Sequence, residues 1–226
     1  MKIKSLAIAA ATLAVGAISS QAQSPVYSQN IVGYATVIYP AGQFVLSANP
    51  FDTGNNVITN VITTPTGASA MYYWNGTTWV TYQYSAGSKQ WKNGAVNVNN
   101  TNLPPGLGFF INAATSFTNV YTGKIVANTG GGTATNALSG NLQPVGSLIP
   151  YADVVTNAGT IHLTVAGAST LQQWDQSLQQ FKSVFTYAAG SKVWKQGTTV
   201  TNPVIKVGEG FFIQAASPTN WVQSLQ

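Results

Sequence analysis

The sequence predicts an all-β protein that consists of two homologous units of about 100 residues, each sandwich-like or barrel-like. Three observations indicate this fold class. Short runs rich in Val, Thr and aromatic residues alternate with Gly, Pro and Asn turn signals, no segment has convincing amphipathic-helix spacing, and one long pattern occurs twice. The units can pack as one pseudo-symmetric body or remain two domains, and the sequence leaves both arrangements open.

The first 22 residues have the pattern of a secretory signal peptide. Lys2 and Lys4 precede an apolar segment over residues 6–18, and Ser20 and Ala22 supply the small residues of a cleavage site. We therefore expect a secreted protein, extracellular or on the cell surface. Because the chain has no cysteine and no later apolar run of membrane-spanning length, we expect no disulfide, no lipid anchor and no membrane span, a pattern more typical of bacterial export.

Extended segments are expected throughout the first unit. The run at 70–74 stops at Asn75-Gly76, which is a two-residue hairpin signal, and the chain resumes as a strand over 77–84. The run at 57–63 is rich in β-branched residues, which favours a strand. The remaining segments expected to be extended are 43–47, 89–92 and 109–111 in the first unit and 171–181 in the second.

The repeated pattern covers most of the chain after the signal peptide. Residues 86–94 read AGSKQWKNG and residues 189–197 read AGSKVWKQG, at an offset of 103. Other pairs of segments match at offsets of 100 and 102, including Gly-x-Gly-Phe-Phe-Ile at 106–111 and 208–213. Such dense matching indicates a duplicated unit. We expect unit 1 at 23–121, a Gly/Thr/Asn-rich linker or loop at 122–139, and unit 2 at 140–226.

Charge is scarce in this chain. Charged residues make up 6% of the sequence, and the formal net charge of +5 includes the two lysines of the signal peptide. The high isoelectric point therefore reflects few acids, without a basic patch. Since nucleic-acid binding depends on clustered Lys and Arg, we expect no nucleic-acid partner.

Two motifs carry a family resemblance. Asn49-Pro50 after a short apolar run, and Pro105-Gly106 leading into Gly-Phe-Phe-Ile, resemble a largely uncharacterised tandem β domain of exported bacterial proteins. The second copy departs from this pattern, since Ile149 replaces the Asn and Lys206-Val207 replaces Pro-Pro. The resemblance implies an exported, surface-associated accessory module, and it supplies no catalytic residues to transfer.

Groups for acid–base chemistry are few. Outside the signal peptide the chain has four acids and one histidine, His162, without a nucleophile-elbow motif. Asp52 and Asp153 occupy nearly equivalent positions in the repeat, so they could pair only across a pseudo-dyad. Asp52 is better explained as a turn residue, and the paired glycines as turns with positive φ. We expect no enzyme activity, no metal site and no cofactor.

Aromatic and lysine side chains are the remaining candidates for a binding site. Exposed Trp and Tyr rings beside Asn, Gln and Lys donors are typical of sugar-binding surfaces, whereas repeated aromatic residues are more often core or cross-strand pairs. Tyr72 and Trp79 lack aromatic counterparts at the repeat offset, which favours a ligand role. Lysines in edge strands also prevent aggregation, and this protective role is the favoured one. The candidate ligand-binding residues are Tyr72, Trp79, Trp91, Trp194, Lys89 and Lys192.

These observations favour a non-enzymatic structural or adhesive protein of the bacterial cell surface or extracellular matrix. Two alternatives stay open: a carbohydrate-binding module that uses exposed Trp and Tyr, and a hydrolase whose site lies between the units. Self-association and surface glycans are the partners that the composition suggests.

Overall fold

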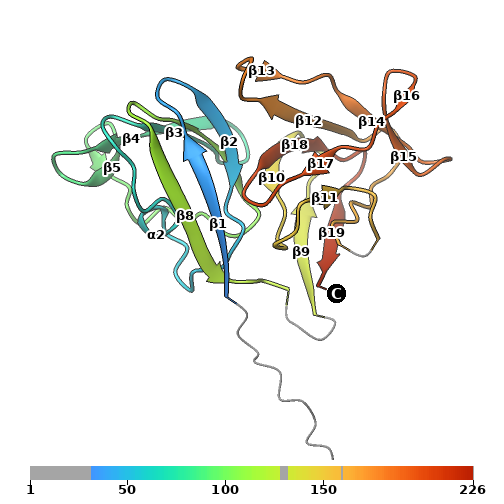
Figure 1. The fold of residues 1–226 in the computed structure, drawn as a ribbon, viewed down its shortest axis with the longest axis horizontal. Helices are drawn as coiled ribbons and strands as arrows, with labels where there is room; N and C mark the ends of the chain where they lie inside the picture. The colour runs from blue at the N-terminus through green and yellow to red at the C-terminus, as the bar shows by residue number, and fades with distance from the viewer. Residues whose placement is uncertain (1–31, 128–131, 159, 226) are drawn as a thin grey trace, which may run out of the picture.

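The computed structural model describes residues 32–127, 132–158 and 160–225, and these residues form antiparallel β-sheets with one short helix (Figure 1). The predicted all-β class is confirmed. None of the sheets formed by the described residues closes into a barrel, and their arrangement is sandwich-like. The predicted signal peptide lies outside the described residues. No helix in the described ranges is both long and apolar enough to cross a membrane.

The first half, residues 32–127, contains a six-stranded sheet and a two-stranded ribbon, with the helix α2 (Ile58–Val61) beside them. In spatial order the sheet contains β2 (Phe44–Ala48), β7 (Gly108–Asn112), β3 (Ala70–Trp74), β4 (Trp79–Ser85), β5 (Gln90–Asn93) and β6 (Val96–Asn97). The ribbon pairs β1 (Val32–Tyr39) with β8 (Phe117–Lys124).

The second half, residues 132–225, has an equivalent order of strands. Its main sheet contains β10 (Gln143–Gly146), β18 (Gly210–Gln214), β12 (Thr170–Asp175), β14 (Phe185–Ala188), β15 (Val193–Gln196) and β16 (Thr199–Val200), with β13 (Gln180–Phe181) paired to β12. Its ribbons pair β9 (Thr133–Leu138) with β19 (Thr219–Ser224), and β11 (Asp153–Val154) with β17 (Val204–Ile205). A duplicated unit would produce this recurrence, and the common origin of the halves stays a prediction.

Alternation along the strands determines which side chains enter the core. In β8, Phe117, Asn119 and Tyr121 are buried while the residues between them face solvent. Tyr39 stacks on Phe117 with ring centroids 4.8 Å apart, and its hydroxyl lies 2.6 Å from the Tyr121 hydroxyl. Burial raises the pKa of Tyr39 to about 12, so the pair stays neutral and hydrogen-bonded at physiological pH.

Three expectations about local structure were wrong. Residues 57–63 include the helix α2 in place of a strand, because Ile58 and Val61 point into the core at helical spacing. The expected linker at 122–139 contains the end of β8 and all of β9, in which Ala134 and Leu138 are buried. The hairpin after Trp74 has a four-residue loop, whose backbone the Asn75 side chain caps.

The halves meet along two symmetric backbone contacts. Ala48 donates its N–H to the Gly208 carbonyl at 3.0 Å, and Gly146, its counterpart, donates to the Gly106 carbonyl at 2.9 Å. Gly106 and Gly208 have φ of 80° and 76°, which confirms the positive-φ turns expected there. The core residues of both halves form one cluster, so the halves pack as one body with grooves along the junction.

Candidate functional site

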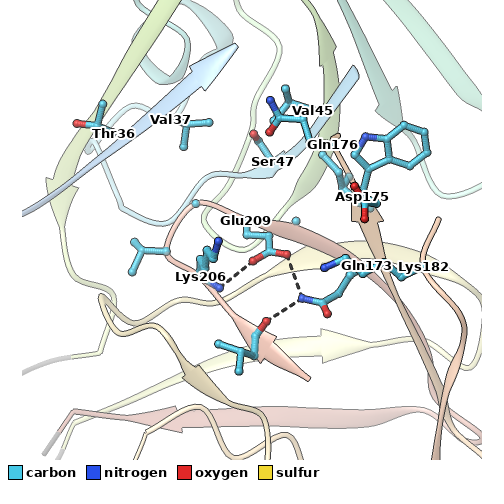
Figure 2. A pocket seen from close by; sticks show the side chains of 16 residues that line it. Thr36, Val37, Val45, Ser47, Gln173, Asp175, Gln176, Lys182, Lys206 and Glu209 are labelled. Atoms are coloured by element: carbon cyan, nitrogen blue, oxygen red, sulfur yellow. Dashed lines mark hydrogen bonds between the residues drawn. The ribbon is translucent and has the colours of Figure 1, made fainter. Parts of the chain in front are cut away.

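A groove of about 480 Å³ lies where β1 and β2 of the first half face β12 and the 204–210 segment of the second half (Figure 2). We call it the junction groove. Val37, Val45 and Trp174 form part of its apolar wall. The polar side chains that line it are Thr36, Ser47, Gln173, Asp175, Gln176, Lys182, Lys206 and Glu209.

Glu209 is the central polar group of the junction groove. One carboxylate oxygen accepts the Lys206 backbone N–H at 3.0 Å, and the other accepts the Gln173 side-chain N–H at 3.0 Å. The same Gln173 amide also donates to the Val204 carbonyl at 2.7 Å, as Figure 2 shows. Glu209 therefore fixes the Gln173 amide, while the side chains of Lys182 and Lys206 remain exposed.

The first half provides an internal comparison for this cluster. The strand registers place Gln173, Lys182, Lys206 and Glu209 where the first half has Tyr73, Val80, Pro104 and Leu107. Three of those residues are apolar side chains packed against the core. Because the first half folds into the same strand order without these polar groups, the fold does not require them. Two of the chain's four acids and two of its seven lysines outside the signal peptide line this one groove.

The edge of β2 adds main-chain groups to the junction groove. Phe44 and Ala48 donate their N–H groups across to Gln179 and Gly208 of the second half. Because alternate residues of a strand point their backbone groups to the same side, Leu46 directs its N–H and C=O to this side as well. Leu46 lines the groove, so it offers its N–H as a donor there, while its C=O faces Gly210 in the antiparallel bridge between Ser47 and Glu209.

A second groove of about 260 Å³ occupies the symmetric position on the other side of the junction. Trp74 takes the place of Trp174 in it, and Asn136 the place of Val37. Pro144 takes the place of Leu46 and has no N–H to offer. No charged residue is among those that line this groove. The two grooves therefore share a shape and differ in chemistry.

The environment of Glu209 disfavours its charged form. Burial raises the pKa of Glu209 above its ordinary value of 4.5, although hydrogen bonds from Lys206 and Gln173 and the nearby lysine charges act in the opposite direction. A carboxyl group with a raised pKa in a groove, at a place where the fold accepts leucine, is a feature of functional sites.

Replacing Glu209 with leucine should leave the free energy of unfolding at pH 7 unchanged or raise it by about 1 kcal/mol. Leu107 already fills the equivalent place in the first half, and the variant no longer buries a carboxylate. Urea denaturation of the protein without its signal peptide measures this difference. A loss of several kcal/mol would mean that the fold depends on the carboxylate.

Glu209→Gln isolates the charge and should give a pH-dependent difference in stability. Since the folded pKa lies above the unfolded one, wild type loses stability relative to the variant as the pH rises through the raised pKa. Below pH 4.5, the ordinary pKa of the group, the carboxyl is protonated in both the folded and the unfolded state, and this loss of stability disappears. The lowered pKa values of Asp153 and Asp175 act at lower pH and in both proteins alike. A difference that stays constant between pH 4 and pH 8 would contradict the assignment.

Asp175 has a structural role at the rim of the junction groove. One of its oxygens accepts hydrogen bonds from the Ser177 hydroxyl and from the backbone N–H groups of Ser177 and Leu178. These bonds, that of the Ser177 hydroxyl first, lower the pKa of Asp175. Asp175 therefore caps the turn between β12 and β13, as Asn75 does in the first half.

The predicted tryptophan and tyrosine candidates separate into two groups. Trp79 is 39% exposed, and Tyr72 is half-buried with its ring 5.4 Å from Phe44. Trp91 and Trp194 are completely buried, so neither ring faces a ligand in solvent. Among these four side chains, Trp79 is therefore the one that exposes a large surface to solvent.

The predicted lysine candidates lie away from the junction groove. Lys89 and Lys192 are exposed, but they belong to the turns before β5 and β15, with φ of 51° and 53°. The expectation that Lys89 belongs to the extended segment at 89–92 was wrong, because β5 begins at Gln90. Neither lysine lines either groove.

The acids considered for a paired site serve turns. Asp52 accepts a hydrogen bond from the Gly54 N–H at 2.8 Å, which confirms the expected Asx-turn. Asp153 accepts hydrogen bonds from the Val154 N–H and from the Thr160 hydroxyl. His162 is exposed on the surface of the second half. The described residues contain no group of three or more His, Cys, Asp or Glu side chains that could hold a metal ion.

Sequence reasoning missed Gln173, Lys182, Lys206 and Glu209. A signal was present, because the aligned motifs pair Glu209 with Leu107, an acid in a nearly uncharged chain opposite an apolar residue. Divergence between the copies, more than similarity, identifies this site.

Comparison of the chain with family models, with curated proteins and with solved structures gave no match. The resemblance to an exported tandem β domain accordingly stays a prediction.

Proposed function

We propose that this chain is a secreted, non-enzymatic adhesive protein of the bacterial surface, and that its junction groove binds a glycan. One observation carries the proposal: Gln173, Lys182, Lys206 and Glu209 gather in this groove, at positions where the first half needs none of them. A ligand-binding role explains why a chain with 6% charged residues concentrates them here.

The chemistry of the groove suits sugar hydroxyl groups. Hydroxyls both donate and accept hydrogen bonds, and the groove offers amides, ammonium groups, a hydroxyl and the Leu46 N–H as partners. The Trp174 ring adds an apolar wall, against which the C–H face of a sugar can pack. The many polar side chains of the groove disfavour a lipid as the ligand, and its balanced charges disfavour a nucleic acid.

The carboxylates of the groove favour binding over hydrolysis. A glycosidase needs one carboxyl group as acid and another as base or nucleophile. Both oxygens of Glu209 already accept protein hydrogen bonds, and Asp175 caps a turn. We infer that Glu209 positions the Gln173 amide and does not transfer protons to a substrate.

The test is a pair of double variants with the same change in charge. Lys182→Gln/Lys206→Gln removes both ammonium groups of the groove, and Lys89→Gln/Lys192→Gln removes two exposed lysines from distant turns. On a glycan array, followed by calorimetric titration of the best hit, the groove variant should bind about tenfold more weakly, as expected for a lost charge-assisted hydrogen bond. The control variant should bind as wild type does.

Two results would overturn the proposal. Equal weakening by both double variants would show a general charge effect in place of a site. Absence of binding to any glycan, with a protein that is folded by circular dichroism, would remove the proposed ligand class.

A further inference from the structure

Six aromatic rings meet at the junction between the halves, and five of them form a row around Phe110, which contacts Trp174, Phe181, Phe212 and Trp79. Successive ring centroids from Trp174 to Phe181, to Phe212, to Trp79 and to Trp74 are 5.0, 5.3, 6.0 and 5.4 Å apart. We call this row the aromatic track. It is built from both halves, because the outward face of each sheet contributes rings at the same place in the strand order.

The register gives Trp79 an aromatic counterpart that sequence matching missed. Trp79 pairs with Trp74 across the β3–β4 hairpin, and Phe181 pairs with Trp174 across the β12–β13 hairpin. Trp79 is 39% exposed and Phe181 is 41% exposed, while Phe212 lies buried between them. Two exposed rings therefore flank the pseudo-dyad on one surface.

Each end of the aromatic track lies in one of the two grooves. Trp174 lines the junction groove, and Trp74 lines the second groove. A ligand in either groove thus meets the track without leaving the surface of the protein. The second groove presents only uncharged polar groups, among them Asn136, Asn141 and Gln143.

We propose that a single glycan chain runs from the junction groove along the aromatic track to the second groove. This inference rests on the proposed function and adds the length and the path of the ligand. Trp79 and Phe181 are the exposed rings of the track, so each can pack against the C–H face of a sugar. The absence of charge among the residues that line the second groove means that the sugars there are neutral.

The experiment measures affinity against chain length. N-acetylglucosamine oligomers and cello-oligosaccharides, from disaccharide to octasaccharide, offer flat pyranose faces and are titrated against the protein without its signal peptide. Affinity should rise by at least about tenfold once the chain reaches from one groove across the track, since added contacts act without new association entropy.

Variants identify the rings that produce the rise in affinity with chain length. Trp79→Ala and Phe181→Ala should each remove most of the increase for long chains and leave disaccharide affinity unchanged, because both rings lie outside the junction groove. Lys182→Gln/Lys206→Gln should weaken short and long chains alike. Tyr34→Ala is the matched control, since Tyr34 is 77% exposed on the β1–β8 ribbon, and it should change neither.

The outcomes separate this inference from the proposed function. If affinity does not depend on chain length, and Trp79→Ala and Phe181→Ala bind as wild type does, the proposed path along the track is overturned. The proposal for the junction groove then stays intact. Failure of every saccharide to bind overturns both, as does preferential binding of an unrelated peptide library. Using two track variants protects the test, because a folding defect in one does not affect the other.

Discussion

Replacing Trp91 with alanine should lower the free energy of unfolding by about 3–5 kcal/mol, because it removes a large buried aromatic side chain and leaves a cavity. Trp91 has no exposed surface, and its ring centroid lies 5.4 Å from that of Tyr84. Its indole N–H has no protein hydrogen-bond partner among the described residues, so packing accounts for its contribution. Urea denaturation measures the loss.

Two further substitutions test whether Trp91 has a structural or a ligand-binding role. Trp194→Ala should lose about as much stability as Trp91→Ala, since Trp194 is equally buried beside Tyr187. Trp79→Ala should lose less, about 1–2 kcal/mol, because the Trp79 ring is partly in solvent and packs against Trp74 and Phe212 with the remainder of its surface. If Trp91→Ala kept its stability and lost glycan binding, the ring would be a ligand contact and the burial argument would fail.

Much of the fold could be predicted from residue types. The runs that became β2, β3, β7 and β12 combine aromatic and β-branched residues with turn signals, and such runs fit a pleated sheet. The run at 57–63 has the same composition and forms α2, because contacts of Ile58 and Val61 with the core decide its structure. Composition alone does not distinguish these two outcomes.

The site was less predictable because the junction brings together residues from distant parts of the chain. Glu209 lies opposite Ser47 only because an edge of β2 meets the turn before β18, and neither sequence segment contains that information. The expected extended segment at 89–92 includes Lys89, but Lys89 has a φ of 51° and the strand begins after it, which residue type alone does not reveal. The divergent pair Leu107 and Glu209 was readable from the aligned copies.

Substituting alanine for Gly108 or Gly210 should lower the free energy of unfolding by about 1–3 kcal/mol in each case, the usual cost of overpacking. A Cβ at Gly108 would lie 2.7 Å from the Pro144 carbonyl carbon, and one at Gly210 would lie 2.6 Å from the Ser47 carbonyl oxygen. Both neighbours are backbone atoms of the opposite half, so the steric clash is relieved only if the two halves move apart. Gly87→Ala, where a Cβ meets nothing within 4 Å, is the control and should change stability by less than about 1 kcal/mol.

The shape of the unfolding transition then tests the single-body packing. Because the core residues of both halves form one cluster, Gly108→Ala should shift one cooperative transition to lower urea without splitting it. Two separate transitions would mean that each half is stable alone and that the junction contributes little. The same variant should weaken glycan binding even under conditions where it is fully folded, since both grooves and the aromatic track are assembled across this junction. A Gly108→Ala protein that binds as tightly as wild type would place the site within one half and contradict the proposed path.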